Sequence, residues 1–191
     1  YSFPSGHSQT SASIFTSLMV QLRKRWVYYL GSLLISLVGV SRMYLGVHRP
    51  VDVLAGIVLG VSWVFVVNYM FDISERTGSK IVFLAFIIPM ILLLPLMPNP
   101  EYYKASGTAL AFYLGYVIES KYIKFQERAG FLFQILKIAL GLAVMITIKE
   151  LLKLILPEVL TSDFIRYFLI GIWGTIAWPY LFNKLGMRIK T

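Results

Sequence analysis

The chain has 191 residues, of which 58% are hydrophobic and only 14% are charged. Its formal net charge is +9, and it contains no cysteine, which excludes disulfides and thiolate zinc sites. Soluble domains carry roughly 25% charged residues, so this composition excludes one soluble domain with a polar surface. It predicts an all-α, polytopic helical membrane protein.

Seven apolar segments follow one another along the chain, and most are close to the ~20 residues that a helix needs to cross a bilayer. The fourth contains Pro89 and Pro95, which should kink it. The fifth is short, and we expect it to be tilted, kinked or partly re-entrant. The sequence therefore predicts about seven transmembrane segments, at residues 7–22, 26–46, 50–71, 81–97, 105–120, 130–156 and 164–182.

Basic residues gather in alternate gaps between these segments, which predicts how the chain is oriented in the membrane. One side collects eleven cations: Arg23, Lys24, Arg25, Arg76, Lys80, Lys121, Lys124, Arg128, Lys184, Arg188 and Lys190. The other side collects five: Arg42, Arg49, Lys104, Lys153 and Arg166. The positive-inside rule places the first side in the cytoplasm, so residues 1–7 and 41–52 face the extracytoplasmic side. Membrane orientation thus accounts for the positive charge, and we expect no nucleic-acid partner.

The first of only two histidines lies at the start of the first segment, in the run YSFPSGH. Pro4 disfavours a helix before it, and Ser5 or Ser8 can cap the helix that follows. Ser5, Gly6 and His7 therefore lie near free backbone N–H groups at a positive helix end, which is a ready anion site. Because Gly6 has no side chain, the backbone there can approach a ligand closely.

The second histidine lies in the run SRMYLGVHRPVD, at residues 41–52. Pro50 is a good first residue for the third segment, and His48 lies just before it. Asp52, in the first turn, points back toward His48 and can accept the imidazole Nδ1–H. That bond would fix the tautomer and leave Nε2 free to attack. A short hairpin brings Arg42 beside His48, where its guanidinium suits phosphate oxygens.

Together these groups predict phosphoryl transfer through a covalent phosphohistidine. His48 would attack phosphorus, and His7 would protonate the departing oxygen and then help to activate water. Arg42, Ser5 and the N–H groups near Gly6 would hold the equatorial oxygens. We expect no metal or other cofactor, because these cations and dipoles neutralise the charge and the chain lacks the acidic cluster that magnesium would want.

The two runs also resemble a known family. They are similar to two signature motifs of the type 2 phosphatidic acid phosphatase superfamily. The second motif matches PSGH at residues 4–7. The third motif matches residues 41–52, which read SR, five residues, H, three residues and D. That family includes membrane lipid phosphatases, prenyl diphosphate phosphatases and soluble vanadium haloperoxidases. The resemblance implies His7 as acid and His48 as nucleophile, with Asp52 as its partner. It implies that the phosphate binders are Ser5, Gly6 and Arg42, with Ser41 in a supporting role.

The family's first motif, a lysine followed by an Arg-Pro pair, belongs upstream of the second and is not found in this chain. The only Arg-Pro pair, Arg49-Pro50, lies inside the third motif. Either the chain is a fragment of a longer one that carries the first motif, or two phosphate-binding cations are missing. We expect residues 1–79 to form a phosphatase-like catalytic core from the first three segments, and residues 80–191 to add further transmembrane helices.

Two other patterns have simple structural interpretations. The sixth segment carries Lys137, Lys149, Glu150 and Lys153, which either line a cleft or indicate an interfacial helix that lies flat, and we favour the second. Gly56 and Gly60 form a small-xxx-small pattern that is typical of close helix packing in membranes.

The sequence thus predicts an integral membrane phosphatase, a phosphoric monoester or diphosphate hydrolase. Its substrate would be a lipid phosphate or prenyl diphosphate, such as undecaprenyl diphosphate, phosphatidylglycerophosphate or phosphatidic acid. The site would face the extracytoplasmic side of the cell membrane, and the bilayer would hold the tail. Two alternatives stay open: a lipid-handling or transport protein that keeps the motifs without turnover, and a phosphotransferase that uses the same histidine. A haloperoxidase does not fit, since those relatives are soluble.

Overall fold

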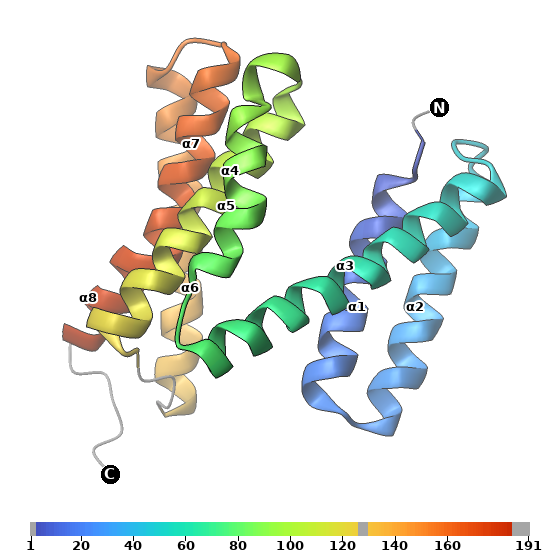
Figure 1. Ribbon diagram of the computed structural model, residues 1–191, viewed down its shortest axis with the longest axis horizontal. Helices are drawn as coiled ribbons and strands as arrows, with labels where there is room; N and C mark the ends of the chain where they lie inside the picture. The colour runs from blue at the N-terminus through green and yellow to red at the C-terminus, as the bar shows by residue number, and fades with distance from the viewer. Residues whose placement is uncertain (1–2, 126–129, 185–191) are drawn as a thin grey trace. The chain divides into compact units, whose positions relative to one another are not determined.

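The structure is a computed structural model that describes residues 3–125 and 130–184. The chain divides into two compact units, Tyr1–Ser79 and Lys80–Thr191. Within the described ranges every regular element is helical, as Figure 1 shows, which confirms the predicted all-α fold class for these residues.

The first unit contains three helices, α1 (Gly6–Leu22), α2 (Arg25–Tyr44) and α3 (Pro50–Thr77), and α1 packs against both others. The bounds of α1 and α2 agree with the predicted segments to within two residues. α3 runs six residues beyond the predicted end at residue 71, because its polar last turns remain helical up to Gly78. Gly78 has φ +66°, the left-handed conformation in which glycine commonly ends a helix.

Small residues line the contact between α1 and α3. A Cβ atom at Gly56 would lie 2.6 Å from the carbonyl oxygen of Ser5, and one at Gly60 would lie 2.5 Å from that of Gln9. Ser13 Oγ donates to the Gly60 carbonyl at 3.2 Å, so the two backbones nearly touch. The prediction that these glycines serve helix packing is confirmed, because any side chain there would push the helices apart.

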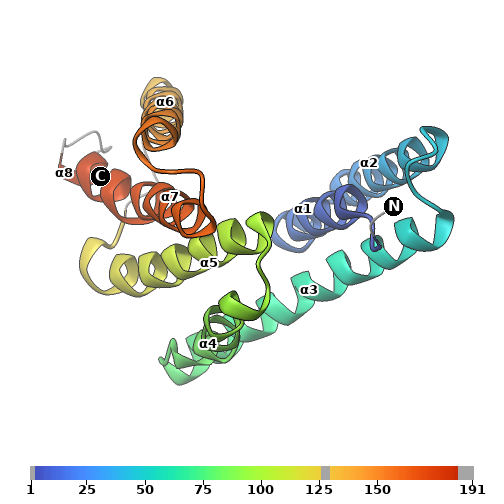
Figure 2. The ribbon, with the colours of Figure 1, turned by 90° about the horizontal axis from the view of Figure 1, so that it is seen from above.

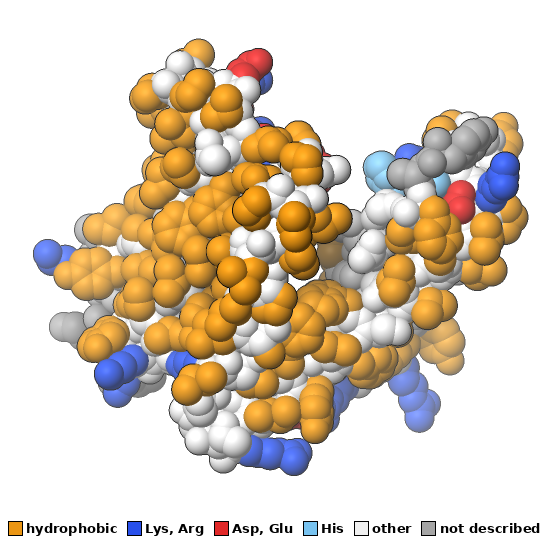
Figure 3. Space-filling model, turned by 45° about the horizontal axis from the view of Figure 1, so that its top comes forward, with side chains coloured by type: hydrophobic (Ala, Val, Ile, Leu, Met, Phe, Trp, Pro, Cys, Tyr) orange, Lys and Arg blue, Asp and Glu red, His pale blue; other side chains and the backbone are white. Residues whose placement is uncertain are grey.

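Large apolar side chains of the first unit point outward instead of filling a core. Buried positions of α1 include Ser8, Ser11 and Ala12, whereas Leu33 and Leu37 of α2 are more than half exposed. Figure 3 shows hydrophobic side chains over much of the visible surface. Apolar surface on this scale is typical of helices whose solvent is lipid.

Two helices in the described part of the chain are long and apolar enough to cross a membrane by length and composition, α2 and α3. The stretch Ile81–Leu96 is apolar but shorter. The predicted count of seven crossings therefore stays a prediction. Three of the cations used for the predicted orientation, Arg128, Arg188 and Lys190, lie outside the described residues.

The second unit is built on α5 (Pro100–Ile118) and α7 (Leu160–Ile172), which lie side by side (Figure 2). A Cβ atom at Gly107 would clash with the Phe164 carbonyl, and one at Gly171 would lie 2.5 Å from the Ala111 methyl. α6 (Phe131–Ile155) joins α7, and Trp173 Nε1 donates to the Gly141 carbonyl at 3.2 Å. Each unit therefore has its own close helix contact at glycine residues.

Three predicted segments of the second unit differ from the structure. Segment 81–97 is split into a 3₁₀ turn (Ile81–Phe83), α4 (Leu84–Leu92) and a second turn (Leu94–Leu96), with Pro89 and Pro95 in the last two pieces. Segment 105–120 begins earlier, because the side chain of Asn99 caps the N–H groups of Glu101 and Tyr102. Segment 164–182 is three pieces, α7, a π-helical turn (Trp173–Ala177) and α8 (Trp178–Lys184), and a π-helical turn (Glu119–Ile123) follows α5.

Candidate active site

The start of α1 is tied directly to the first turn of α3. The N–H of Ser5 donates to the Asp52 carbonyl at 3.0 Å, and the Ser5 carbonyl accepts the first helical bond, from Gln9 N at 3.0 Å. Ser5 is thus the N-cap residue of α1 by position, one of the two serines that the sequence analysis offers as a cap. This bond joins the PSGH run to the VD end of the second run, although 47 positions separate them.

The hydroxyl of Ser5 does not cap the helix. Ser5 is fully buried, and its Oγ accepts from Ser8 Oγ at 3.1 Å. Ser8 is fully buried too, and its carbonyl accepts from Ser11 Oγ at 3.0 Å. The role of Ser8 as the hydroxyl partner of Ser5 was absent from the sequence prediction, although the spacing of three residues places both on one helix face.

The N–H groups of the first turn of α1 remain for a ligand. The N–H groups of Gly6, His7 and Ser8 open the helix and donate to no backbone carbonyl among the described residues. A Cβ atom at Gly6 would meet nothing within 4 Å, so the backbone there faces open space. His7 is exposed and makes no hydrogen bond or ion pair with any residue that the structure describes. The N-terminal end of α1 therefore offers a ligand both the positive end of the helix dipole and the imidazole of His7.

The start of α3 holds the second histidine. Nδ1 of His48 lies 3.7 Å from Oδ2 of Asp52, and the two side chains are 11% and 9% exposed. The same Oδ2 accepts the backbone N–H of Arg49 at 2.9 Å, which caps α3 before Pro50. The predicted hydrogen bond from Nδ1 is therefore not formed, and the buried Nδ1 has no acceptor among the described residues.

Arg42 lies in the last turn of α2, directly before the hairpin that leads to His48. The hairpin is tight, since Val47 N donates to the Arg42 carbonyl at 3.3 Å and Gly46 adopts φ +65°. Nε of Arg42 donates to Ser41 Oγ at 3.4 Å, and Ser41 Oγ donates to the Val38 carbonyl at 2.8 Å. Ser41 thus orients the guanidinium and leaves its terminal NH₂ groups free of that bond.

The predicted site residues lie at one end of the first unit. Ser5, Gly6 and His7 open α1, His48 and Asp52 open α3, and Arg42 and Ser41 close α2. Figure 3 shows histidine side chains at this end. Among the described residues no three His, Cys, Asp or Glu side chains gather in a way that could hold a metal ion. The side chains at this end that could hold an anion include the guanidinium groups of Arg42 and Arg49 and the two imidazoles.

Comparison with known proteins identifies the family of the chain. Residues 1–76 match the PAP2 superfamily, and residues 103–190 match the PAP2 superfamily phosphatase transmembrane extension. The chain belongs to the PAP2 superfamily. The resemblance to type 2 phosphatidic acid phosphatases seen in the two sequence runs is thereby confirmed, and the match to a transmembrane extension supports a membrane protein.

Two similar proteins are named as phosphatases. The chain is 40% identical over 89 residues to phosphatidylglycerophosphatase B of Bacillus subtilis, an alignment that covers 42% of this chain and 44% of the relative. It is 44% identical over 78 residues to the undecaprenyl-diphosphatase of Sulfolobus acidocaldarius, covering 41% of this chain and 35% of the relative. The chain spans less than half the length of either relative. No solved structure matches it.

Proposed function

We propose that the protein is an integral membrane phosphatase that removes phosphate from a lipid phosphate or a prenyl diphosphate. The observation that carries the proposal is the 3.0 Å bond from Ser5 N to the Asp52 carbonyl. It joins the N-terminal ends of α1 and α3, which supports one shared site built from the N–H groups of the first helix start and the histidine of the second. Membership of the PAP2 superfamily and the names of both relatives support the same chemistry.

His48 is the proposed nucleophile. Its Nε2 lone pair forms a bond to phosphorus while the bond from phosphorus to the leaving oxygen breaks, which gives a phosphohistidine and a departing alcohol or phosphate. The carboxylate of Asp52, 3.7 Å from Nδ1, stabilises the positive charge that the ring gains. Water then attacks the phosphohistidine, which releases inorganic phosphate and restores the ring.

His7 is the proposed acid and base. It gives its proton to the leaving oxygen in the first step and takes a proton from the attacking water in the second. The three equatorial oxygens of the phosphoryl group would be held by Arg42 and by the N–H groups at Gly6. Ser5 would bind the phosphoryl group from the start of α1, where its hydroxyl is hydrogen-bonded to that of Ser8, and Ser41 would position Arg42. The charge is neutralised by these groups without a metal.

The substrate would lie at the membrane interface, with its tail among the helices. Undecaprenyl diphosphate, phosphatidylglycerophosphate and phosphatidic acid all present a terminal phosphate on a lipid anchor. The predicted topology of seven crossings turns this end of the first unit toward the extracytoplasmic side. Residues 1–79 would carry catalysis, and residues 80–191 would add membrane helices to it.

The test is phosphate release by the purified protein in detergent micelles that contain each of these three lipids. We expect release with at least one of them, its loss in His48→Ala, and a labelled phosphoprotein after rapid acid quenching of the wild type. Equal release by His48→Ala would exclude the phosphohistidine. Lipid binding or movement without release would favour the lipid-handling alternative, and transfer of the label to an added sugar or lipid alcohol would favour the phosphotransferase.

A further inference from the structure

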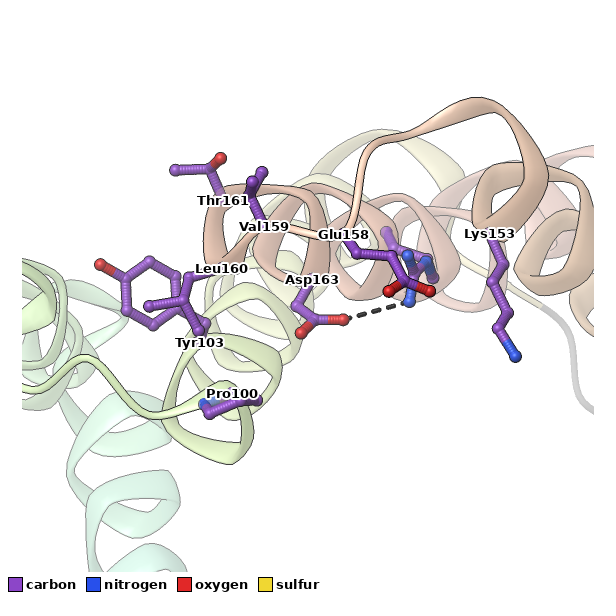
Figure 4. Close-up of a pocket in the computed structure, with 9 residues that line it drawn as sticks. Pro100, Tyr103, Lys153, Glu158, Val159, Leu160, Thr161 and Asp163 are labelled. Carbon is purple, nitrogen blue, oxygen red and sulfur yellow. Dashed lines mark hydrogen bonds and ion pairs between the residues drawn. The ribbon is translucent and has the colours of Figure 1, made fainter.

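The second unit contains an open groove of about 690 Å³ (Figure 4). It is lined by Pro100 and Tyr103 at the start of α5, Lys153 near the end of α6, Glu158 in the connection to α7, and Asp163 and Arg166 in α7. These residues come from helix ends or, for Glu158, from the loop between two helices. Helices that cross a bilayer meet the lipid headgroups at their ends, and the match of residues 103–190 to a transmembrane extension supports such crossings. Four of the lining residues are charged, which sets this groove apart from the apolar surface of α6.

Arg166 is the most buried charge of the groove. Its side chain is 13% exposed, and Nη1 donates to Oδ1 of Asp163 at 3.1 Å. Its Nε is also buried and donates to no acceptor among the described residues. Burying a guanidinium with an N–H group that has no acceptor costs free energy, and further oxygen acceptors would remove that cost. Phosphate oxygens suit the planar arrangement of its N–H groups. The buried cation therefore favours an anionic group in the groove.

Lys153 and Glu158 add one charge of each sign. Both are exposed, and neither forms an ion pair with a residue that the structure describes. Figure 4 shows the carboxylates of Glu158 and Asp163 in the middle of the groove and Lys153 on one side. The four ionisable side chains thus carry two positive and two negative charges. A ligand with no net charge, but with both a phosphate and an ammonium group, complements this set better than an anion does.

Apolar side chains beside the groove indicate that the ligand is a lipid. Leu142 and Ile146 lie eleven and seven residues before Lys153, on the same face of α6 and toward its middle, and they are 49% and 60% exposed. A headgroup bound to Lys153 would therefore place its hydrocarbon chains against this outer surface of α6. Free phosphate would contact only the charged side chains of the groove and not the apolar surface beside it.

We propose that this groove binds the headgroup of a zwitterionic phospholipid that carries a primary ammonium group, such as phosphatidylethanolamine. Its phosphate contacts Arg166 and Lys153, and its ammonium group donates to Glu158. The proposed phosphatase substrates carry a net negative charge, so this lipid is a bound partner of the second unit and not the substrate. The inference does not depend on the proposed function.

The test is native mass spectrometry of the full chain released from micelles that contain equal amounts of phosphatidylethanolamine, phosphatidylcholine and phosphatidylglycerol. We expect the wild type to retain phosphatidylethanolamine preferentially. Lys153→Met should lower its retention about tenfold, the scale for loss of a charged hydrogen bond. Glu158→Gln should lower the preference for phosphatidylethanolamine over phosphatidylglycerol by about the same factor. Both residues are exposed, so neither change should unfold the protein.

Matched controls are available on the same helix. Lys149 and Glu150 form an exposed ion pair at 3.6 Å and do not line the groove, so Lys149→Met and Glu150→Gln should retain lipid as the wild type does. Equal retention of all three lipids by the wild type would overturn the proposal, and so would equal losses in the groove and control variants. Displacement of phosphatidylethanolamine by inorganic phosphate at matching concentration would also overturn it, because a free anion would then be the ligand.

Discussion

Oδ2 of Asp52 lies 3.7 Å from Nδ1 of His48 and accepts the backbone N–H of Arg49 at 2.9 Å. One carboxylate oxygen therefore caps a helix and faces the proposed nucleophile at the same time. The first distance is longer than a hydrogen bond, so in this structure the carboxylate acts on the imidazole through its charge. Capping and electrostatic stabilisation can be separated experimentally, since only the second needs a charge.

Asp52→Asn should keep the fold and lower turnover. The amide oxygen can still accept the Arg49 N–H, but it no longer offers a negative charge to the imidazolium. We expect phosphate release to fall by roughly 100-fold or more, while the thermal unfolding midpoint stays near that of the wild type. Asp52→Ala should also lose the cap and about 1 kcal/mol of stability. Asp52→Asn with full activity would show that the carboxylate serves the helix alone.

Gly6→Ala should impair catalysis without unfolding. The backbone of Gly6 faces open space, so an added methyl group clashes with nothing in the protein but occupies the region that phosphate oxygens would use. We expect phosphate release to drop by about 10- to 100-fold, the scale of a displaced substrate. Gly174→Ala is the control, because its added methyl group also meets nothing within 4 Å and it lies in the second unit. Equal activity of the two variants would remove Gly6 from the phosphate site.

Gly56→Ala should destabilise the first unit and lower activity together. The new Cβ would lie 2.6 Å from the Ser5 carbonyl, which is backbone and cannot move away without separating α1 from α3. We expect a loss of about 1–3 kcal/mol in the free energy of unfolding. In Gly31→Ala the added methyl group meets the flexible end of Met19, so the cost should be smaller. Thermal unfolding in detergent compares the two, and a larger loss in Gly31→Ala would contradict the packing argument.

The predicted orientation can be measured with single cysteines, because the chain has none of its own. We expect Val47→Cys, in the hairpin before His48, to react with a membrane-impermeant maleimide added to intact cells. Lys24→Cys, between α1 and α2, should react only after the membrane is permeabilised. The reverse pattern would place the proposed site in the cytoplasm.

Sequence reasoning predicted the helices of the first unit well, because clear signals mark their ends. Pro50 opens α3, and the polar run at Arg23–Arg25 separates α1 from α2. It was less accurate in the second unit. The cap by Asn99 extends α5 over charged residues, and a π-helical turn at Trp173–Ala177 has no signature in hydrophobic periodicity. Apolar content alone does not show where a helix changes its hydrogen-bond pattern.

The candidate site was predictable as a set of residues but not as a network. Two motifs with fixed spacing indicate which side chains form the candidate site. They do not show that the Ser5 hydroxyl is hydrogen-bonded to that of Ser8. Nor do they show that the Arg49 N–H competes for the Asp52 oxygen. Both bonds depend on backbone geometry at helix starts, where several donors lie within reach of one acceptor.

In a water-soluble protein the interior is apolar and the surface tolerates polar substitutions. The contact between α1 and α3 gives this unit a different pattern of tolerated substitutions. Inside, where Gly56 and Gly60 meet backbone oxygens, one extra carbon is too many. Outside, Leu33 and Leu37 are more than half exposed and would face hydrocarbon chains, which adapt to any apolar outline. Homologous sequences are therefore expected to drift on their lipid-facing surface and to retain glycine, serine and alanine within, and a variant library for this fold should randomise its exterior first.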